Sequence, residues 1–156
     1  MKAYCDTSFF RRRMMPGKFH AEASAAGLAI EGELGFIPLS SLARFEFVQG
    51  LRFDVWLHRA DKSKGLPAAV ADSVLNLFLA EVGGSFHLTL LDYEVVFAQA
   101  ELLSRQTPVQ GYRAPDILHV AAAASLGAED FYSFDRKQSE LANSQGMKTP
   151  LFVFAA

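Results

Sequence analysis

Four acidic residues, far apart in the sequence, carry the chemistry that the chain suggests. Asp6 follows the apolar segment "AYC", Glu46 lies in "SSLARFEF", Asp116 opens the alanine-rich "RAPDILHVAAAA", and Asp135 ends "FYSFD". Carboxylates brought together repel one another, and such clusters normally persist because a hard divalent cation neutralises them. Ligands that offer only oxygen suit Mg²⁺ or Mn²⁺ better than Zn²⁺. The four acids therefore predict a site for Mg²⁺ or Mn²⁺.

Hydroxyl groups lie close to two of these acids in the sequence. Ser133 is two residues before Asp135, on the same face of a predicted strand, and Thr7 and Ser8 follow Asp6. We expect these hydroxyls to hold a water molecule bound to the metal. One or two metal ions lower the pKa of such a water, so no side-chain nucleophile is required.

The elements that must position the acids follow from the periodicity of the apolar residues. We expect strands at 2–6, 34–39, 86–92, 130–135 and 149–154, a basic turn after the first strand, and helices at 18–33, 40–60, 66–82, 93–106, 114–127 and 136–146. Strands that alternate with helices predict a mainly parallel central sheet covered on both faces, which is a three-layer α/β/α sandwich.

This architecture would bring the acids to one place. Parallel strands end at the same edge of a sheet, and ligands bind beyond that edge. Asp6 ends the first predicted strand and Asp135 the fourth, while Asp116 lies in the first turn of a helix that begins at the same edge. Glu46 lies close to the apolar face of its predicted helix. We therefore expect the four carboxylates to converge.

Length and composition limit the class of protein. The 156 residues show no repeat and no linker, which predicts a single domain spanning residues 1–156. With 51% hydrophobic residues and no apolar run near the roughly 18 residues of a membrane span, we expect a compact protein outside the membrane. Cys5 is the only cysteine, so no intrachain disulfide forms, and the N-terminal segment lacks the pattern of a secretory signal. A cytoplasmic location is expected.

The net charge of −2 is mildly acidic, but the basic residues gather beside the acids. Arg11, Arg12 and Arg13 follow Asp6, and Arg136 directly follows Asp135. Next to a metal site these four arginines are candidates for contacts with the phosphates of a polyanionic substrate. The alternative for the run at 11–13 is a solvated turn.

The segments "YCDTS", "SSLARFEF", "RAPDILHVAAAA" and "FYSFDRKQSELA" resemble, in order and spacing, the pattern of PIN-domain ribonucleases, in particular the VapC-like toxins of type II toxin–antitoxin systems. The resemblance implies a Mg²⁺-dependent endoribonuclease in which Asp6, Glu46, Asp116 and Asp135 bind the metal and Ser133 is an accessory hydroxyl. It also implies a cognate antitoxin and a homodimer. Single-stranded RNA loops are the expected target because their splayed bases can be read. The segment 9–33, with its three arginines, departs from the family pattern.

Each acid also has a simpler explanation. Asp116 could be an ordinary acid at a helix N-terminus, which the helix dipole favours. Asp135 could be the N-cap of the helix at 136–146. Glu46 could be an exposed acid that pairs with Arg44 or Arg52.

Two other functions are compatible with the sequence. The first is a catalytically silent PIN-like module that binds RNA or protein. The second is an aspartyl-phosphate phosphotransferase with Asp6 as nucleophile, although such enzymes usually show D-x-D-x-T and Ser8 occupies the place of the second acid. No P-loop, dinucleotide-binding, zinc-protease or nucleophile-elbow motif is present.

His119 and Trp56 are expected to have structural roles. His119, three residues after Asp116, is expected to be a half-buried helix histidine because an oxygen-rich Mg²⁺ site has no use for imidazole. Trp56, together with Phe47 and Phe53, is expected in the core, with a surface for a partner protein as the alternative.

Overall fold

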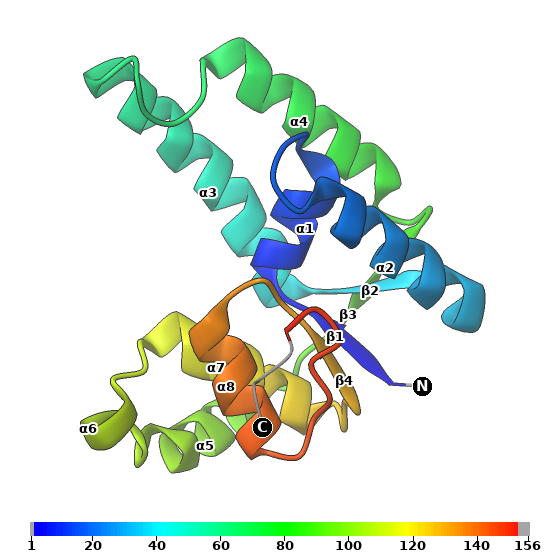
Figure 1. Cartoon of the computed structure of the whole chain (residues 1–156), viewed down its shortest axis with the longest axis vertical. Coiled ribbons are helices and arrows are strands. Elements are labelled where there is room, and N and C mark those ends of the chain that lie inside the picture. Colours follow the sequence, from blue (N-terminus) through cyan, green and yellow to red (C-terminus); the bar gives the residue numbers. More distant parts are fainter. Residues whose placement is uncertain (1, 153–156) are drawn as a thin grey trace.

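The structure, a computed structural model, describes residues 2–152 (Figure 1). Its strands are β1 (Ala3–Cys5), β2 (Ile37–Ser40), β3 (Phe86–Thr89) and β4 (Asp130–Tyr132). Its helices are α1 (Thr7–Met14), α2 (His20–Leu34), α3 (Ser41–Ala60), α4 (Ala68–Glu81), α5 (Tyr93–Ser104), α6 (Thr107–Gln110), α7 (Ala114–Ser125) and α8 (Arg136–Ser144).

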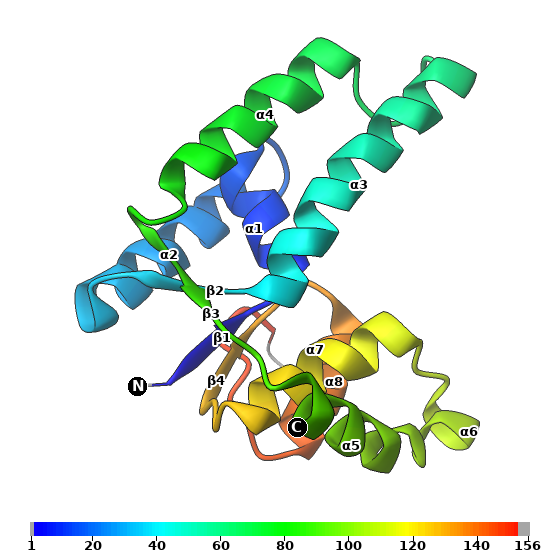
Figure 2. The ribbon, with the colours of Figure 1, turned by 180° about the vertical axis from the view of Figure 1, so that it is seen from behind.

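The strands form the parallel centre that the sequence predicts. β1 pairs in parallel with β4, and β2 pairs in parallel with β3, as two two-stranded ladders. β1 lies next to β2 without a ladder between them in the described residues, which gives the spatial order β3, β2, β1, β4. Helices α1 to α4 lie on one side of the strands, and α5, α7 and α8 lie on the other (Figures 1 and 2). The predicted α/β class with three layers is therefore confirmed.

The alternation of side chains along the central strands fills a separate core on each face. On β1, Cys5 packs with the core under α1 to α4, whereas Tyr4 packs with the core under α5, α7 and α8. On β4, Tyr132 and Phe131 divide in the same way. This period of two is what a strand buried on both faces requires, and Cys5 is one of the buried side chains.

The predicted basic turn after β1 is wrong, because these residues form helix α1. Phe9 and Phe10 are fully buried, and the Phe10 ring packs edge-on against Phe78 and Phe86. The three arginines follow in the last turn of the helix. An eight-residue helix offers too few positions for a periodic pattern, and two adjacent phenylalanines do not indicate a helix rather than a strand.

The prediction that Trp56 and Phe53 belong to the core is also wrong. Phe47 is buried and stacks on Phe78, but Phe53 and Trp56 are 50% and 59% exposed and stack on each other. Helices α3 and α4 extend beyond the strands (Figures 1 and 2), so the later turns of α3 pack against α4 on one face only and leave Phe53 and Trp56 on an exposed face. In the described part of the chain, no helix has both the length and the apolar character needed to cross a bilayer.

The strand predicted at 149–154 does not form within the described residues. Lys148 makes a single parallel bridge to Asp130 beside β4, and a turn follows, closed by a hydrogen bond from the Phe152 amide to the Thr149 carbonyl. Residues 153–154 of this prediction lie outside the described residues. One bridge extends the edge of β4 without adding a strand to the sheet.

Candidate active site

Asp6 is a fully buried carboxylate at the carboxyl end of β1. Its backbone N–H continues the ladder to β4 by donating to the Tyr132 carbonyl at 3.1 Å. Its Oδ1 accepts from the Phe9 amide at 2.9 Å and from Ser8 Oγ at 2.7 Å, so Asp6 is also the N-cap of α1. Its Oδ2 accepts from Ser133 Oγ at 2.7 Å. The predicted proximity of Asp6 and Ser133 is therefore present.

These hydrogen bonds do not compensate for the burial of the Asp6 charge. Burial raises the pKa of Asp6, and the nearby His119, the two serine hydroxyls and the Phe9 amide lower it only in part. Among the described residues no lysine or arginine forms an ion pair with this carboxylate. A cation placed beside Asp6 would supply the missing compensation.

Glu46 lies in the second turn of α3, and its carboxylate points toward α1 and α7. Its Oε2 accepts from Thr7 Oγ1 at 2.6 Å and from the Nε2 of His119. The side chain is 27% exposed. The alternative in which Glu46 pairs with Arg44 or Arg52 is not what the structure shows, because no described ion pair joins them.

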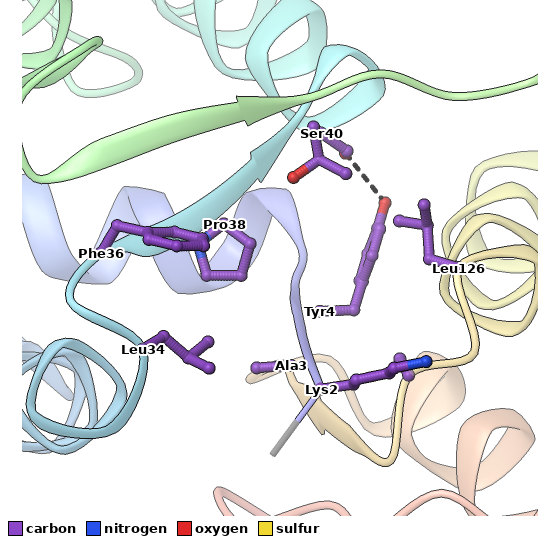
Figure 3. A pocket seen from close by; sticks show the side chains of 10 residues that line it. Lys2, Ala3, Tyr4, Leu34, Phe36, Pro38, Ser40 and Leu126 are labelled. Carbon is purple, nitrogen blue, oxygen red and sulfur yellow. Dashed lines mark hydrogen bonds between the residues drawn. The ribbon is translucent and has the colours of Figure 1, made fainter.

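His119 is a residue of the candidate site that the sequence reasoning missed. It was expected to be half-buried, but it is fully buried in α7. Its Nε2 contacts Glu46, and its Nδ1 is 2.8 Å from the Tyr4 hydroxyl. That hydroxyl is in turn 3.1 Å from Ser40 Oγ (Figure 3). The available signal was a single polar residue within the apolar run "ILHVAAAA", one turn after Asp116.

The surroundings of Glu46 favour its charged form. Partial burial acts to raise the pKa of Glu46, but the hydrogen bond and the charge of His119, with the hydrogen bond of Thr7, outweigh it and lower that pKa. Burial raises the pKa of the Tyr4 phenol, so its hydroxyl keeps a proton to donate. Glu46 is thus an ionised carboxylate without any metal.

Asp116 and Asp135 both take the helix-start roles that were considered as alternatives. Asp116 Oδ2 accepts from the Arg113 amide at 3.1 Å in the first turn of α7. Asp135 is the N-cap of α8 and accepts from the Gln138 amide at 3.0 Å. The Asp135 amide also donates to Ser133 Oγ at 2.9 Å, which links Asp135 to the partner of Asp6. Gln138 Nε2 lies 3.5 Å from Asp116 Oδ1, which links the starts of α7 and α8.

The four acids therefore surround one edge of the sheet without forming a single cluster. Within residues 2–152, no group of three or more histidine, cysteine, aspartate or glutamate side chains is arranged to hold a metal ion. The available donors are carboxylate and hydroxyl oxygens, which is the chemistry that Mg²⁺ and Mn²⁺ prefer. The donor set fits such an ion, and the metal site remains a prediction.

The basic residues that follow Asp6 in the sequence have different partners in the structure. Arg11 forms an ion pair with Asp54, with Nη2 and Oδ2 2.6 Å apart. Arg12 and Lys18 extend over the ring of Phe19, at 5.7 and 4.8 Å from its centre. Arg13 turns toward α2, where its Nε is buried without a hydrogen-bond partner. Of the run at 11–13, only Arg11 therefore reaches the side of the molecule that carries Glu46.

A shallow groove runs beside Glu46, between α1 and α3. Its lining includes Thr7, Arg11, Phe45 and Phe53, and the two aromatic rings are largely exposed. Gly50 leaves room for the guanidinium of Arg11, because a Cβ there would lie 2.9 Å from Nη1. On the other side of the site, Arg136 is exposed and pairs with Glu140 on α8 at 2.7 Å.

Comparison with known proteins identifies the fold. No protein-family model matches the sequence, and no curated protein matches it. Among solved structures the chain is similar to the crystal structure of VapC20 of Mycobacterium tuberculosis, described as a Sarcin-Ricin loop cleaving toxin. The two chains are 19% identical, the match covers 88% of this chain and 93% of that one, and the TM-score is 0.56. The chain has the VapC-like PIN fold, which confirms the resemblance at the level of the fold.

Proposed function

We propose that this protein is a divalent-metal-dependent endoribonuclease and the toxin of a toxin–antitoxin pair. The observation that carries the proposal is the Asp6 carboxylate, which is fully buried at the end of a central strand, has a raised pKa and forms no ion pair among the described residues. The similarity to VapC20, itself a toxin that cleaves an RNA loop, supports the same reaction class. A cognate antitoxin and a homodimer belong to this proposal.

In the proposed site, Asp6 and Glu46 hold Mg²⁺ or Mn²⁺, and Asp116 and Asp135 complete the carboxylate set from the starts of α7 and α8. When bound, such an ion supplies a water of lowered pKa and stabilises charge on the leaving oxygen. The hydroxyls of Ser133 and Thr7 donate to the Asp6 and Glu46 carboxylates. Their role is to orient these carboxylates, rather than to hold the metal-bound water.

The groove beside Glu46 supports single-stranded RNA as the substrate. Exposed aromatic rings such as Phe45 and Phe53 can stack with unpaired bases, and this stacking is tolerant of sequence. Arg11 at the same groove offers a positive charge for a phosphate. Unpaired bases are available in RNA loops, whereas the deep groove of an A-form helix is closed to side chains.

A second candidate function is a silent PIN-like module that binds RNA without cleaving it. The roles of Asp116 and Asp135 at the starts of α7 and α8 favour it, because both carboxylates already have backbone partners. The phosphotransferase has less support. Ser8 stands where the D-x-D-x-T pattern of such enzymes has its second acid, and its hydroxyl donates to Asp6.

An RNA cleavage assay separates these functions. The substrates are an RNA stem–loop with the sarcin–ricin sequence and a mixture of cellular RNA, each with Mg²⁺, Mn²⁺ or EDTA. We expect cleavage with either metal and none in EDTA, and a loss of about 10²- to 10³-fold for Asp6→Asn and Glu46→Gln, as for other groups that stabilise transition-state charge. Asp72→Asn, an exposed acid on α4, is the matched control.

Undiminished cleavage in EDTA would contradict the metal-dependent mechanism. RNA binding without cleavage under every metal condition would favour the silent module. Wild-type activity in Asp6→Asn would place the reaction at another part of the molecule.

A further inference from the structure

A chain of buried polar groups leads from the interior of the protein to Glu46. It begins at Ser40, whose Oγ is 3.1 Å from the Tyr4 hydroxyl, and passes through His119 to the Glu46 carboxylate. Ser40, Tyr4 and His119 are all buried. Polar groups in such positions destabilise a core unless each has a partner, so the continuity of this chain requires an explanation.

The hydrogen-bond directions along the chain can be assigned from its ends. An ionised Glu46 only accepts, so Nε2 of His119 carries the hydrogen that it donates. Ser40 Oγ accepts from the Ala43 amide at 3.1 Å and can donate its own hydrogen to Tyr4. When His119 is neutral, the Tyr4 hydroxyl then donates to Nδ1 of His119. Every donor meets an acceptor, and the imidazole is fixed in one tautomer and one orientation.

The Tyr4 ring is itself held firmly. It stacks on Phe131 with the two ring centres 5.5 Å apart and the planes within 9°. Its other surroundings include the apolar wall of a pocket lined by Leu34, Phe36 and Leu126, with the hydroxyl turned inward to Ser40 (Figure 3). A rigid ring is a suitable anchor for the next group in the chain.

We propose that His119 is a positioning residue for Glu46, anchored by Tyr4. His119 and Thr7 both donate to Oε2 of Glu46, whereas Oε1 accepts no hydrogen bond from any described residue. The carboxylate is thus held by one oxygen, and the other is available as a ligand. This inference rests on the proposed function, because it assigns the free oxygen to the cation. Partners that orient a metal ligand typically affect metal affinity or activity 10- to 100-fold.

The test measures metal binding without RNA and then kinetics with RNA. Mn²⁺ affinity is measured by calorimetry for wild type, His119→Leu, His119→Gln and Tyr4→Phe, with the fold checked by circular dichroism. We expect His119→Leu to weaken Mn²⁺ binding about 10- to 100-fold and to lower kcat with little change in the KM for RNA. His119→Gln, which keeps a side-chain N–H donor, should recover part of the loss, and Tyr4→Phe should have the smallest effect. His87→Leu, at an exposed histidine on β3, is the matched control.

Each outcome decides the inference. If folded His119→Leu binds Mn²⁺ and turns over as the wild type does, the positioning role is overturned while the proposed function stands. If the wild type neither binds Mn²⁺ nor cleaves RNA, both are overturned. If His119→Leu does not fold, His119→Gln and Tyr4→Phe decide, and wild-type Mn²⁺ affinity and kcat in both would overturn the role.

Discussion

Asp6 and Glu46 differ in the groups that surround their carboxylates. Asp6 is fully buried and receives hydrogen bonds from two serine hydroxyls and an amide, and burial raises its pKa. Glu46 is partly exposed and receives hydrogen bonds from an imidazole and a threonine hydroxyl, which lower its pKa despite some burial. The difference lies in the donors, because only Glu46 accepts a hydrogen bond from a group that can carry positive charge.

This contrast suggests that Asp6 and Glu46 would contribute to a metal site in different ways. The protein alone keeps Glu46 ionised and oriented, so this ligand is preorganised before a metal binds. Asp6 carries an electrostatic cost that a bound cation would remove, which couples binding to the stability of the fold. Three predictions test the contrast, from the largest expected effect to the smallest.

The first prediction concerns stabilisation by Mg²⁺. Metal that binds only the native state should stabilise the wild type by about 2.7 kcal/mol at roughly a hundred times its dissociation constant. Asp6→Asn should lose nearly all of this gain, and Glu46→Gln a smaller share, because only Asp6 depends on the cation for compensation. Thermal melts with EDTA and with Mg²⁺ measure both. Equal gains in wild type and Asp6→Asn would show that the metal binds without Asp6.

The second prediction concerns pH in metal-free buffer, where the two acids should act with opposite signs. The pKa of Asp6 is raised above 3.8, so its contribution to stability is lost as pH rises through the folded-state value and recovered as pH falls. The pKa of Glu46 is lowered below 4.5, so its contribution is present above that value and lost as pH falls through the folded-state value. One pKa unit corresponds to about 1.4 kcal/mol, less for the partly exposed Glu46.

Thermal melts in EDTA between pH 7 and pH 4 measure these two slopes. The difference in Tm between wild type and Asp6→Asn should move in favour of the wild type as pH falls. The Tm of the wild type should fall relative to the Tm of Glu46→Gln at the acidic end of the range. Slopes of the same sign for both variants would refute the contrast between the two carboxylates.

The third prediction concerns whether bound RNA lies on the side of the site that carries Glu46. Arg11 borders the groove beside Glu46, and its removal should flatten the salt dependence of RNA binding by about 0.7 in the log–log slope if it contacts one phosphate of a single strand. Binding is measured by fluorescence anisotropy in an Asp6→Asn background. Arg59→Ala, at an exposed arginine in the last turn of α3, is the control. An unchanged slope in Arg11→Ala would direct the strand toward Arg12 or Arg136 instead.

The sequence was sufficient for the parallel sheet because strand and helix periods alternate clearly and Asp6 ends a strand whose neighbours are buried. The predicted strand at 130–135 ends at Tyr132, so Ser133 and Asp135 do not share a strand face, and Ser133 instead donates to Asp6 across the two strands. The helix at Thr7–Met14 was missed because its apolar face consists of only Phe9 and Phe10. The exposed Trp56 was missed because sequence does not reveal how far α3 and α4 project beyond the sheet.

His119 was misjudged for a different reason. Its partners Tyr4 and Glu46 are 115 and 73 residues away, so no local pattern could indicate the contact. A histidine in an alanine-rich helix is usually explained by its own helix, whereas here two other elements determine its role. Long-range hydrogen bonds of this kind require the tertiary structure.

Asp6 and Thr7 are consecutive residues, so a single peptide bond joins the two carboxylate environments. The Asp6 side chain caps the first turn of α1, and the Thr7 hydroxyl in that same turn donates to Glu46. Fraying of this turn would release the cap and the Glu46 contact in one event, which makes the two acids part of one local unfolding unit. The hydrogen-exchange rate of the Phe9 amide therefore reports on both environments at once, and opening of this one turn would loosen both carboxylates together.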